Sequence, residues 1–275
     1  MTYKRILTIQ DISCVGQCSL TVALPILSAC GLETAILPSA VLSTHTAGFS
    51  GYTFRDLTDD IPAITEHWEK EKITFDAIYT GYLGSTKQID YVKAIIAGLL
   101  RQGGASFVDP AMADNGKLYP AFDENYVEAM KELCFAADYC LPNITEACFL
   151  TGIEYREQYD EKYIAELLGA MKENGAENVI LTGVGYVPDK TGVVVLENGK
   201  TDYYEHKKIS KGCHGTGDVY ASAFVGLFMN GRNACEAARL AADFTVACIE
   251  NTQDDPQHWY GVKFEECIPD LTKML

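Results

Sequence analysis

The residues best suited to chemistry form one short run, 212–218, which reads Gly-Cys-His-Gly-Thr-Gly-Asp. A helix-forming stretch of mostly small and apolar residues follows it. Free backbone amides at the start of a helix bind anions, and glycines let a ligand approach the main chain. A carboxylate beside such a site, here Asp218, can accept the proton of an attacking hydroxyl, so the run suits phosphoryl transfer to an alcohol. A tight turn that caps a helix would use the same residue types, and this motif alone leaves both interpretations open.

Further acidic and amide side chains stand where apolar runs end. Asp109 closes one such run, and α/β proteins bind ligands at the carboxyl ends of their strands. Asn143 and Glu146 are three residues apart, a spacing that places them on one face of a helix. Carboxylates next to a triphosphate require a hard cation such as Mg²⁺, which prefers oxygen ligands. A structural alternative exists for each, because Asp109 could form a turn and Asn143 could cap a helix.

Short apolar segments that alternate with amphipathic ones must position these residues. Strands are predicted at 6–10, 34–37, 77–80, 106–109, 139–141 and 179–182. Helices are predicted at 19–30, 61–71, 86–101, 124–136, 145–151, 161–174, 215–230 and 234–249. The alternation predicts an α/β fold with a mostly parallel sheet and helices on both faces. No repeat or linker interrupts it, so we expect one domain over residues 1–275.

A hairpin is predicted near the end of this pattern. The dipeptide Asn198-Gly199 is a strong turn signal between apolar runs at 192–196 and 201–206. We expect these two strands to be antiparallel and to lie at one edge of the sheet.

Composition excludes several classes of function. The formal net charge of −16 disfavours binding to nucleic acids and to anionic membrane surfaces. No apolar run is long enough to span a membrane, and the ten cysteines are scattered without a CxxC pair. We therefore expect a cytoplasmic protein with reduced thiols and no zinc site. The sequence also lacks the glycine patterns of P-loop kinases and of dinucleotide-binding dehydrogenases.

Several motifs together resemble those of the pyridoxal kinases, a branch of the ribokinase superfamily. Run 215–218, followed by a small-residue helix, is similar to the anion-hole motif of ribokinase-type enzymes. The other similar stretches appear in the family's order along the chain: 6–10 with 15–16, 43–46, 80–85, 109–112, and Pro142-Asn143-x-x-Glu146. The resemblance implies a ribokinase-like three-layer fold. It also implies a kinase that uses ATP to phosphorylate the 5′-hydroxymethyl group of pyridoxal, pyridoxamine or pyridoxine.

Two alternatives stay open beside this reading. A hydroxymethylpyrimidine kinase, or another small-molecule kinase of the superfamily, would share most of the architecture. An inactive vitamer-binding protein would belong to a different class, but it would have no need of Asp218 beside an anion hole. Activity with a panel of acceptors separates the three.

The resemblance also implies roles for individual residues. Asp218 would be the catalytic base, in an anion hole formed by Gly215, Thr216 and Gly217. The substrate-binding residues would be Asp11, His45, Thr46, Tyr82 and Cys213. The ATP-binding residues would be Asp109, Asp114, Tyr119, Asn143 and Thr182. Glu146 and Asp109 would organise Mg²⁺, largely through water, and the resemblance also allows a monovalent cation such as K⁺ and a homodimer.

The chain departs from the family's pattern at a few positions. Asp11 stands where pyridoxal kinases usually have serine after the glutamine, and Leu141 replaces a serine or threonine before Pro-Asn. Gly183 and the pair Cys213-His214 are also unusual. These departures bear on the choice of vitamer and on the ATP contacts.

Overall fold

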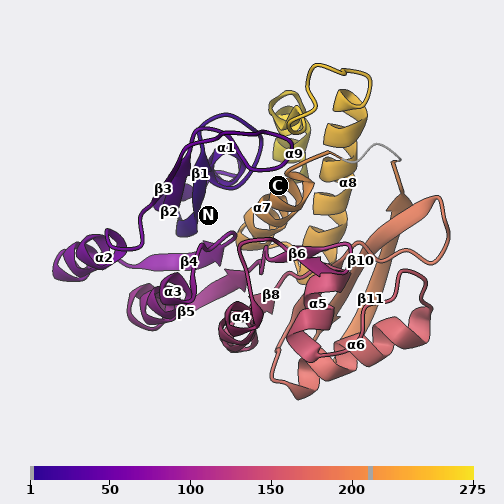
Figure 1. Cartoon of the computed structure of the whole chain (residues 1–275), viewed down its shortest axis with the longest axis horizontal. Helices are drawn as coiled ribbons and strands as arrows, with labels where there is room; N and C mark the ends of the chain where they lie inside the picture. The colour runs from indigo at the N-terminus through magenta and orange to yellow at the C-terminus, as the bar shows by residue number, and fades with distance from the viewer. Residues whose placement is uncertain (1–2, 210–212) are drawn as a thin grey trace.

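A single nine-stranded sheet organises the fold in this computed structural model, which describes residues 3–209 and 213–275. The strands of the sheet are β1 (Arg5–Ser13), β2 (Glu33–Leu42), β3 (Phe54–Asp56), β4 (Phe75–Thr80), β5 (Leu100–Val108), β8 (Tyr139–Cys140), β9 (Val179–Thr182), β10 (Lys190–Glu197) and β11 (Lys200–Lys207). Their spatial order is β11-β10-β9-β8-β5-β4-β1-β2-β3 (Figure 1). Six neighbouring strands run parallel: β9, β8, β5, β4, β1 and β2. At the two edges of the sheet, β3 pairs antiparallel with β2, β10 with β9, and β11 with β10.

Helices cover both faces of the sheet (Figure 1). One face carries α1 (Leu20–Ala29), α7 (Thr216–Met229), α8 (Ala234–Thr252) and α9 (Ile268–Met274), with the short 3₁₀ helix η1 (Phe264–Cys267). The other face carries α2 (Ile61–Lys70), α3 (Thr86–Leu99), α4 (Glu124–Ala136), α5 (Ile144–Thr151) and α6 (Glu161–Glu173). This arrangement confirms the expected three-layer α/β fold. A two-stranded ribbon, β6 (Ala113–Asp114) and β7 (Lys117–Leu118), lies after β5.

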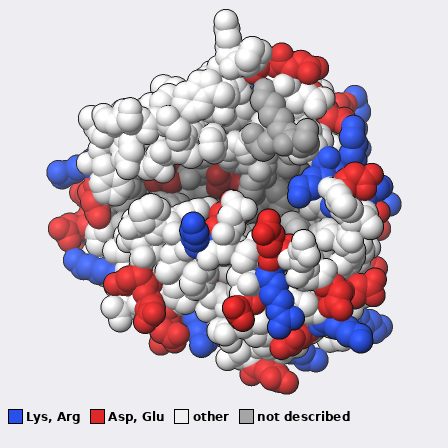
Figure 2. All heavy atoms as spheres, turned by 45° about the vertical axis from the view of Figure 1, so that its right-hand side comes forward, with Lys and Arg blue, Asp and Glu red and all other residues white. Residues whose placement is uncertain are grey.

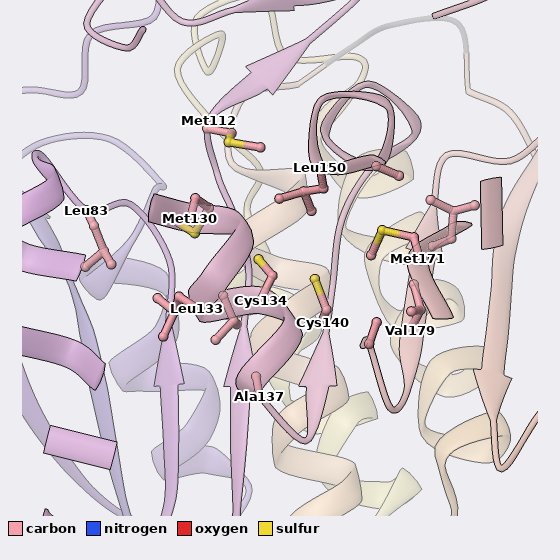
Figure 3. Close-up of a cluster of buried hydrophobic side chains, with 14 of the residues drawn as sticks. Leu83, Met112, Met130, Leu133, Cys134, Ala137, Cys140, Leu150, Met171 and Val179 are labelled. Atoms are coloured by element: carbon pink, nitrogen blue, oxygen red, sulfur yellow. The ribbon is translucent and has the colours of Figure 1, made fainter. Parts of the chain in front are cut away.

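Each face of the sheet has its own hydrophobic core. Side chains along a strand point alternately to opposite faces. In β1, Ile6 therefore packs against the α7 and α8 layer, whereas Leu7 and Ile9 pack against the α3 and α4 layer. Figure 3 shows part of the second core, in which Leu133 and Cys134 of α4 lie over the strands. Because both faces are buried, the central strands read as nearly continuous apolar runs.

The direction in which the chain crosses the sheet changes at β1. From β1 the chain passes to β2 on one side, and it later returns to β4 on the other side. Open α/β sheets bind ligands at the carboxyl ends of the strands beside such a reversal. The loops after β1, β4 and β5 meet at this edge, so it is the expected position of a site.

The structure corrects several predicted boundaries. The first strand continues to Ser13, with a bulge between Gln10 and Ile12, so Asp11 lies within β1 and not in a following loop. The second strand continues past Pro38 to Leu42. The helix predicted to end at residue 101 ends at Leu99, where β5 begins, and α9 was not predicted. The hairpin around Asn198-Gly199 is confirmed as β10 and β11.

No helix within residues 3–209 and 213–275 is both long enough and apolar enough to cross a bilayer.

Candidate active site

The glycine-rich turn leads directly into α7. Gly215 occupies the N-cap position of that helix with a left-handed backbone, φ 75°. A Cβ atom added there would lie 1.6 Å from the carbonyl oxygen of Gln17. Only glycine fits both the backbone conformation and this close approach. The turn that precedes α7 is thereby held against the loop that follows β1; Gly212, the first residue of the motif, lies outside the described residues.

Asp218 stands in the first turn of α7, as predicted. Burial raises the pKa of its carboxyl group to about 7, a hydrogen bond from the Ser19 backbone opposes this rise, and the Asp11 carboxylate adds to it. A carboxyl group with a pKa near neutrality can both accept and release a proton at physiological pH. Asp218 follows Thr216 and Gly217 in the first turn of this helix, so its place agrees with the predicted one.

Three of the residues predicted to bind substrate lie together beside Asp218. The Asp11 side chain is 6% exposed and accepts a hydrogen bond of 3.0 Å from the Ser13 hydroxyl. Its charge affects the pKa of Tyr82, which burial raises to about 12, and it also interacts with His45. The structure therefore places Asp11 near His45, near Tyr82 and near Asp218.

The other two residues predicted to bind substrate, Cys213 and Thr46, lie in different surroundings. The ring of His214 lies 5.5 Å from that of His45, and the neighbouring Cys213 is half-buried and packs against the core on the α7 and α8 face of the sheet. Thr46 follows His45 in sequence, but its side chain is exposed. Its contact with a substrate stays a prediction.

Asn143 and Glu146 form a capping box at the start of α5. The Asn143 side-chain oxygen accepts the Glu146 backbone N–H at 2.9 Å, and Oε2 of Glu146 accepts the Asn143 backbone N–H at 2.9 Å. The other carboxylate oxygen of Glu146 accepts the Met112 backbone N–H at 3.0 Å. The Asn143 amide donates to the carbonyl of Ala113 at 2.8 Å. This pair therefore ties the loop after β5 to α5, in addition to capping the helix.

The other residues predicted to bind ATP lie around the capping box of α5. Asp109 directly follows β5 and accepts the Ala111 backbone N–H at 3.1 Å. The Thr182 backbone N–H, at the end of β9, donates to the Pro142 carbonyl at 2.9 Å, next to Asn143. Asp114 and Tyr119, at the ribbon after β5, are more exposed, and the charge of Asp114 affects the pKa of Glu146.

Acidic side chains gather at this edge of the sheet. Burial raises the pKa of Asp109 well above its ordinary value, and the charges of Glu146 and Asp218 raise it further. Burial also raises the pKa of Glu146 to about 7, against three backbone hydrogen bonds. Among the described residues, no ion pair includes these carboxylates. Figure 2 shows a groove with acidic side chains inside it.

These carboxyl groups have no Lys or Arg partner among the described residues. Their oxygen atoms are therefore suitable ligands for a hard divalent cation that binds together with a phosphate group. Within the residues that the structure describes, no three His, Cys, Asp or Glu side chains form a complete metal site. Mg²⁺ commonly binds through one or two carboxylates together with substrate phosphates and water. The donor set at Asp109 and Glu146 agrees with that pattern.

Sequence reasoning missed several contacts that shape the pocket. Nε2 of His45 lies 2.8 Å from the carbonyl oxygen of Tyr260, in a segment more than 200 residues away. The ring of Phe49 packs against that of Trp259 at 4.6 Å. These contacts depend on tertiary structure, and no local spacing in the sequence indicates them.

Comparison with known proteins gives consistent matches. The model of the phosphomethylpyrimidine kinase family matches residues 54–262. A hydroxymethylpyrimidine/phosphomethylpyrimidine kinase of Bacillus subtilis is 30% identical over 223 residues, which are 78% of this chain and 77% of the relative.

Two solved structures match the described fold over almost the whole chain. A candidate phosphomethylpyrimidine kinase from Bacteroides thetaiotaomicron, crystallised with pyridoxal, is 34% identical with a TM-score of 0.92, and the match covers 98% of this chain and 96% of that one. Pyridoxal kinase from Lactobacillus plantarum is 30% identical with a TM-score of 0.92, covering 99% and 98%.

Proposed function

The chain belongs to the phosphomethylpyrimidine kinase family, and from this premise we propose that it transfers the γ-phosphoryl group of ATP to the 5′-hydroxymethyl group of a vitamin B6 vitamer. It is a phosphotransferase with an alcohol as acceptor. The choice of acceptor rests on one observation. A solved structure that is 34% identical to this chain was crystallised with pyridoxal. The positions of Asp11, His45 and Tyr82 support the same choice, because a small aromatic alcohol bound beside them would lie near Asp218, the proposed base.

Asp218 would act as the general base in this reaction. The acceptor hydroxyl must lose its proton as it attacks the phosphorus atom, and a carboxylate within hydrogen-bond reach can accept that proton. The backbone amides of Gly215, Thr216 and Gly217, at the N-terminus of α7, would stabilise the negative charge that the transferred group carries. Because the pKa of Asp218 is about 7, the fraction of enzyme with an ionised base should increase as pH rises through neutrality.

The nucleotide would lie along the loops after β5, β8 and β9. Asn143, Thr182, Asp114 and Tyr119 surround this region, and their contacts with ATP are part of the proposal. Asp109 and Glu146 would hold Mg²⁺, directly or through water, and Mg²⁺ would neutralise phosphate charge when bound. A monovalent cation, a homodimer and a cytoplasmic location agree with the resemblance and stay predictions.

A hydroxymethylpyrimidine kinase is the second candidate function. The 30% identical relative from Bacillus subtilis favours it, and that acceptor also carries a hydroxymethyl group on a six-membered nitrogen heterocycle. Such an acceptor could occupy the same pocket, so the choice between the two depends on ring substituents.

A substrate panel with the purified chain tests the proposal. ADP release is measured with pyridoxal, pyridoxamine, pyridoxine, hydroxymethylpyrimidine and ribose, each with ATP and Mg²⁺. We expect the highest kcat/KM with a B6 vitamer, and no acceptor-dependent release by Asp218→Asn. A higher kcat/KM for hydroxymethylpyrimidine would instead establish the second candidate, and a preference for ribose would exclude both.

A further inference from the structure

Gly183 directly follows Thr182, the last residue of β9, and opens a turn over residues 183–185. Its backbone is left-handed, with a φ of 78°. No atom lies within 4 Å of a Cβ added at this position, so the backbone conformation, and not crowding, requires glycine there. Whatever fixes this turn therefore also bears on the placement of Thr182, which is among the residues proposed to bind ATP.

Strand β10 holds one side of this turn. The Val184 backbone N–H donates to the Gly192 carbonyl at 3.1 Å. A Cβ added at Gly185 would lie 2.4 Å from the carbonyl oxygen of Lys190, closer than Cβ atoms come to other atoms in proteins. The two backbones therefore approach each other closely. Three polar groups of the turn need partners from other elements: the Gly183 carbonyl, the Val184 carbonyl and the Gly185 N–H.

Two tyrosine hydroxyls pair with these three groups. The Tyr159 hydroxyl accepts the Gly185 N–H at 3.0 Å and donates to the Gly183 carbonyl at 3.3 Å. The Tyr203 hydroxyl donates to the Val184 carbonyl at 3.3 Å. Contacts of 3.3 Å are longer than is typical for a hydroxyl donor, whereas 3.0 Å is ordinary for a backbone N–H. Tyr159, with two contacts that include the ordinary one, is therefore the main partner of the turn.

A third tyrosine packs against the rings of the other two. The ring of Tyr186 lies 6.4 Å from that of Tyr159 and 5.1 Å from that of Tyr203, edge to face in both pairs. Aromatic rings favour this arrangement at such distances. All three rings are half-buried and pack on the core of the sheet face that carries α6. Ring packing therefore holds the two hydroxyls in place, and removal of one hydroxyl leaves that packing intact.

The hydroxyls are not needed merely to satisfy the polar groups of the turn. Gly183 is exposed, so water could bond to its carbonyl equally well. A turn with two glycines has many accessible conformations, and its ordering costs more entropy than that of other residues. What the tyrosines add is therefore a single fixed conformation of the turn.

We propose that Tyr159, assisted by Tyr203, is a positioning residue that fixes the turn after β9 for the binding of the nucleotide. The proposal rests on the proposed function, in which Thr182 contacts ATP. The Thr182 N–H already donates to the Pro142 carbonyl at 2.9 Å, and the tyrosines hold the residues that follow it. A turn that is ordered before the nucleotide arrives loses less entropy on binding, which increases affinity.

Tyr159→Phe tests this role, because it keeps the ring and removes both contacts with the turn. Isothermal titration calorimetry with Mg²⁺ and the non-hydrolysable ATP analogue AMP-PNP measures the affinity. We expect Kd to rise ~5- to 10-fold, KM for ATP to rise by a similar factor, and KM for the acceptor to stay unchanged. Tyr203→Phe removes only one long contact, so its Kd should rise by about 2-fold.

Tyr163→Phe is the matched control for the loss of a tyrosine hydroxyl. Its ring lies 5.9 Å from that of Tyr159, but its hydroxyl donates to the Glu154 carbonyl at 2.8 Å. This substitution should lower the melting temperature by about 3 °C and leave the affinity for AMP-PNP unchanged. Tyr159→Phe should show the opposite pattern, with weaker binding and a melting temperature close to that of the wild type.

The titration needs no acceptor, so it separates this proposal from the choice of substrate. If the wild type binds AMP-PNP but phosphorylates no acceptor, the proposed function fails, and the affinities of the variants still decide the role of Tyr159. Unchanged affinity in Tyr159→Phe would overturn the positioning role. An equal loss of affinity in Tyr159→Phe and Tyr163→Phe would also overturn it, because general destabilisation would then explain both.

Discussion

At the scale of single residues, Asp218 is the position where geometry and acidity agree most closely. Asp218→Asn keeps the shape of the side chain but cannot accept a proton. We expect kcat to fall by at least ~100-fold, the usual contribution of a positioned general base, while nucleotide affinity changes little. Steady-state kinetics and nucleotide titration measure both quantities. Asp90→Asn, at a side chain that is 72% exposed on α3, is the control; a kcat near wild type in Asp218→Asn would remove that residue from catalysis.

Asp11 is the residue at which the sequence departs most clearly from the pyridoxal kinase pattern that it otherwise resembles. The side chain is buried within β1, and burial raises its pKa. A carboxylate in such a place strongly favours a cationic ligand group. Pyridoxamine carries an ammonium group at the 4′ position, where pyridoxal has an aldehyde and pyridoxine an alcohol. If Asp11 faces that position, the enzyme should prefer pyridoxamine by roughly ten- to a hundredfold.

The comparison of wild type with Asp11→Ser decides this point. We expect the variant to lose kcat/KM selectively with pyridoxamine and to keep it with pyridoxal. An equal loss with both substrates would instead place Asp11 near the ring nitrogen, which all vitamers share. No loss with either would reduce it to a structural partner of Ser13.

At the scale of elements, the capping box of α5 has a structural role, and we propose that it also acts at the Mg²⁺ site. Glu146→Gln replaces one carboxylate oxygen with an NH₂ group, which would face a backbone N–H of Asn143 or Met112. We expect a loss of roughly 1–3 kcal/mol in the free energy of unfolding, because a buried N–H loses its acceptor. We also expect a higher Mg²⁺ requirement, because the charge near Asp109 decreases. Thermal unfolding and a Mg²⁺ titration of activity measure the two effects.

The chain contains a matched control for this substitution. Glu236 stands three residues after the N-cap Asn233 of α8, which is the same Asn-x-x-Glu spacing, but on an exposed helix end. Glu236→Gln should change stability by a few tenths of a kcal/mol and leave the Mg²⁺ titration unchanged. If Glu146→Gln shows the same small effects, the box is only a helix cap.

Two loops that are distant in sequence form one wall of the acceptor pocket. Gly48 has a positive φ of 84°, and an added Cβ would lie 2.7 Å from the ring of Trp259. Gly48→Ala should displace this indole and loosen the Tyr260 carbonyl that holds His45. We expect KM for the acceptor to rise ~10-fold, with KM for ATP unchanged. Gly51→Ala, where φ is 70° and no atom lies within 4 Å of the new Cβ, controls for backbone strain.

An equal rise of KM in both glycine variants would show that backbone strain, and not the contact with Trp259, causes the effect. An unchanged KM in Gly48→Ala would show that this wall does not shape the pocket.

The order of the elements was largely predictable, whereas their ends were not. Apolar periodicity identified the central strands, because a strand buried on both faces leaves a clear apolar run. The second strand was predicted to end before Pro38, which cannot donate to the sheet. In the structure β2 continues because its pairing with β1 shifts at a bulge beside this residue.

The candidate site was predictable only where it depends on local motifs. The turn before Asp218 and the Asn143–Glu146 spacing both encode contacts within a few residues. The contact of His45 with Tyr260 joins segments that only the folded chain brings together.

At the scale of the whole molecule, the acidic site and the net charge of −16 make stability depend on pH. Burial raises the pKa of Asp218 from 3.8 to about 7 and that of Glu146 from 4.5 to about 7. At a pH between the unfolded and the folded pKa values, these two groups hold protons in the folded protein that the unfolded chain has released. The free energy of unfolding therefore decreases as pH rises through this range. We expect the melting temperature to fall by roughly 5 °C or more from pH 5 to pH 8.

Other surface carboxylates do not reverse this trend. Hydrogen bonds from the Arg5 backbone and from Arg101 lower the pKa of Asp76, and the hydrogen bond from Lys263 lowers that of Asp255, so the stabilising effect of both carboxylates is already complete near pH 5. Thermal unfolding at fixed ionic strength measures the dependence. Asp218→Asn removes one of the two titrating groups, so this variant should have a smaller slope and, at pH 8, a higher melting temperature than the wild type. A melting temperature that rises from pH 5 to pH 8 in the wild type would mean that the buried carboxyl groups do not retain their protons in the folded state.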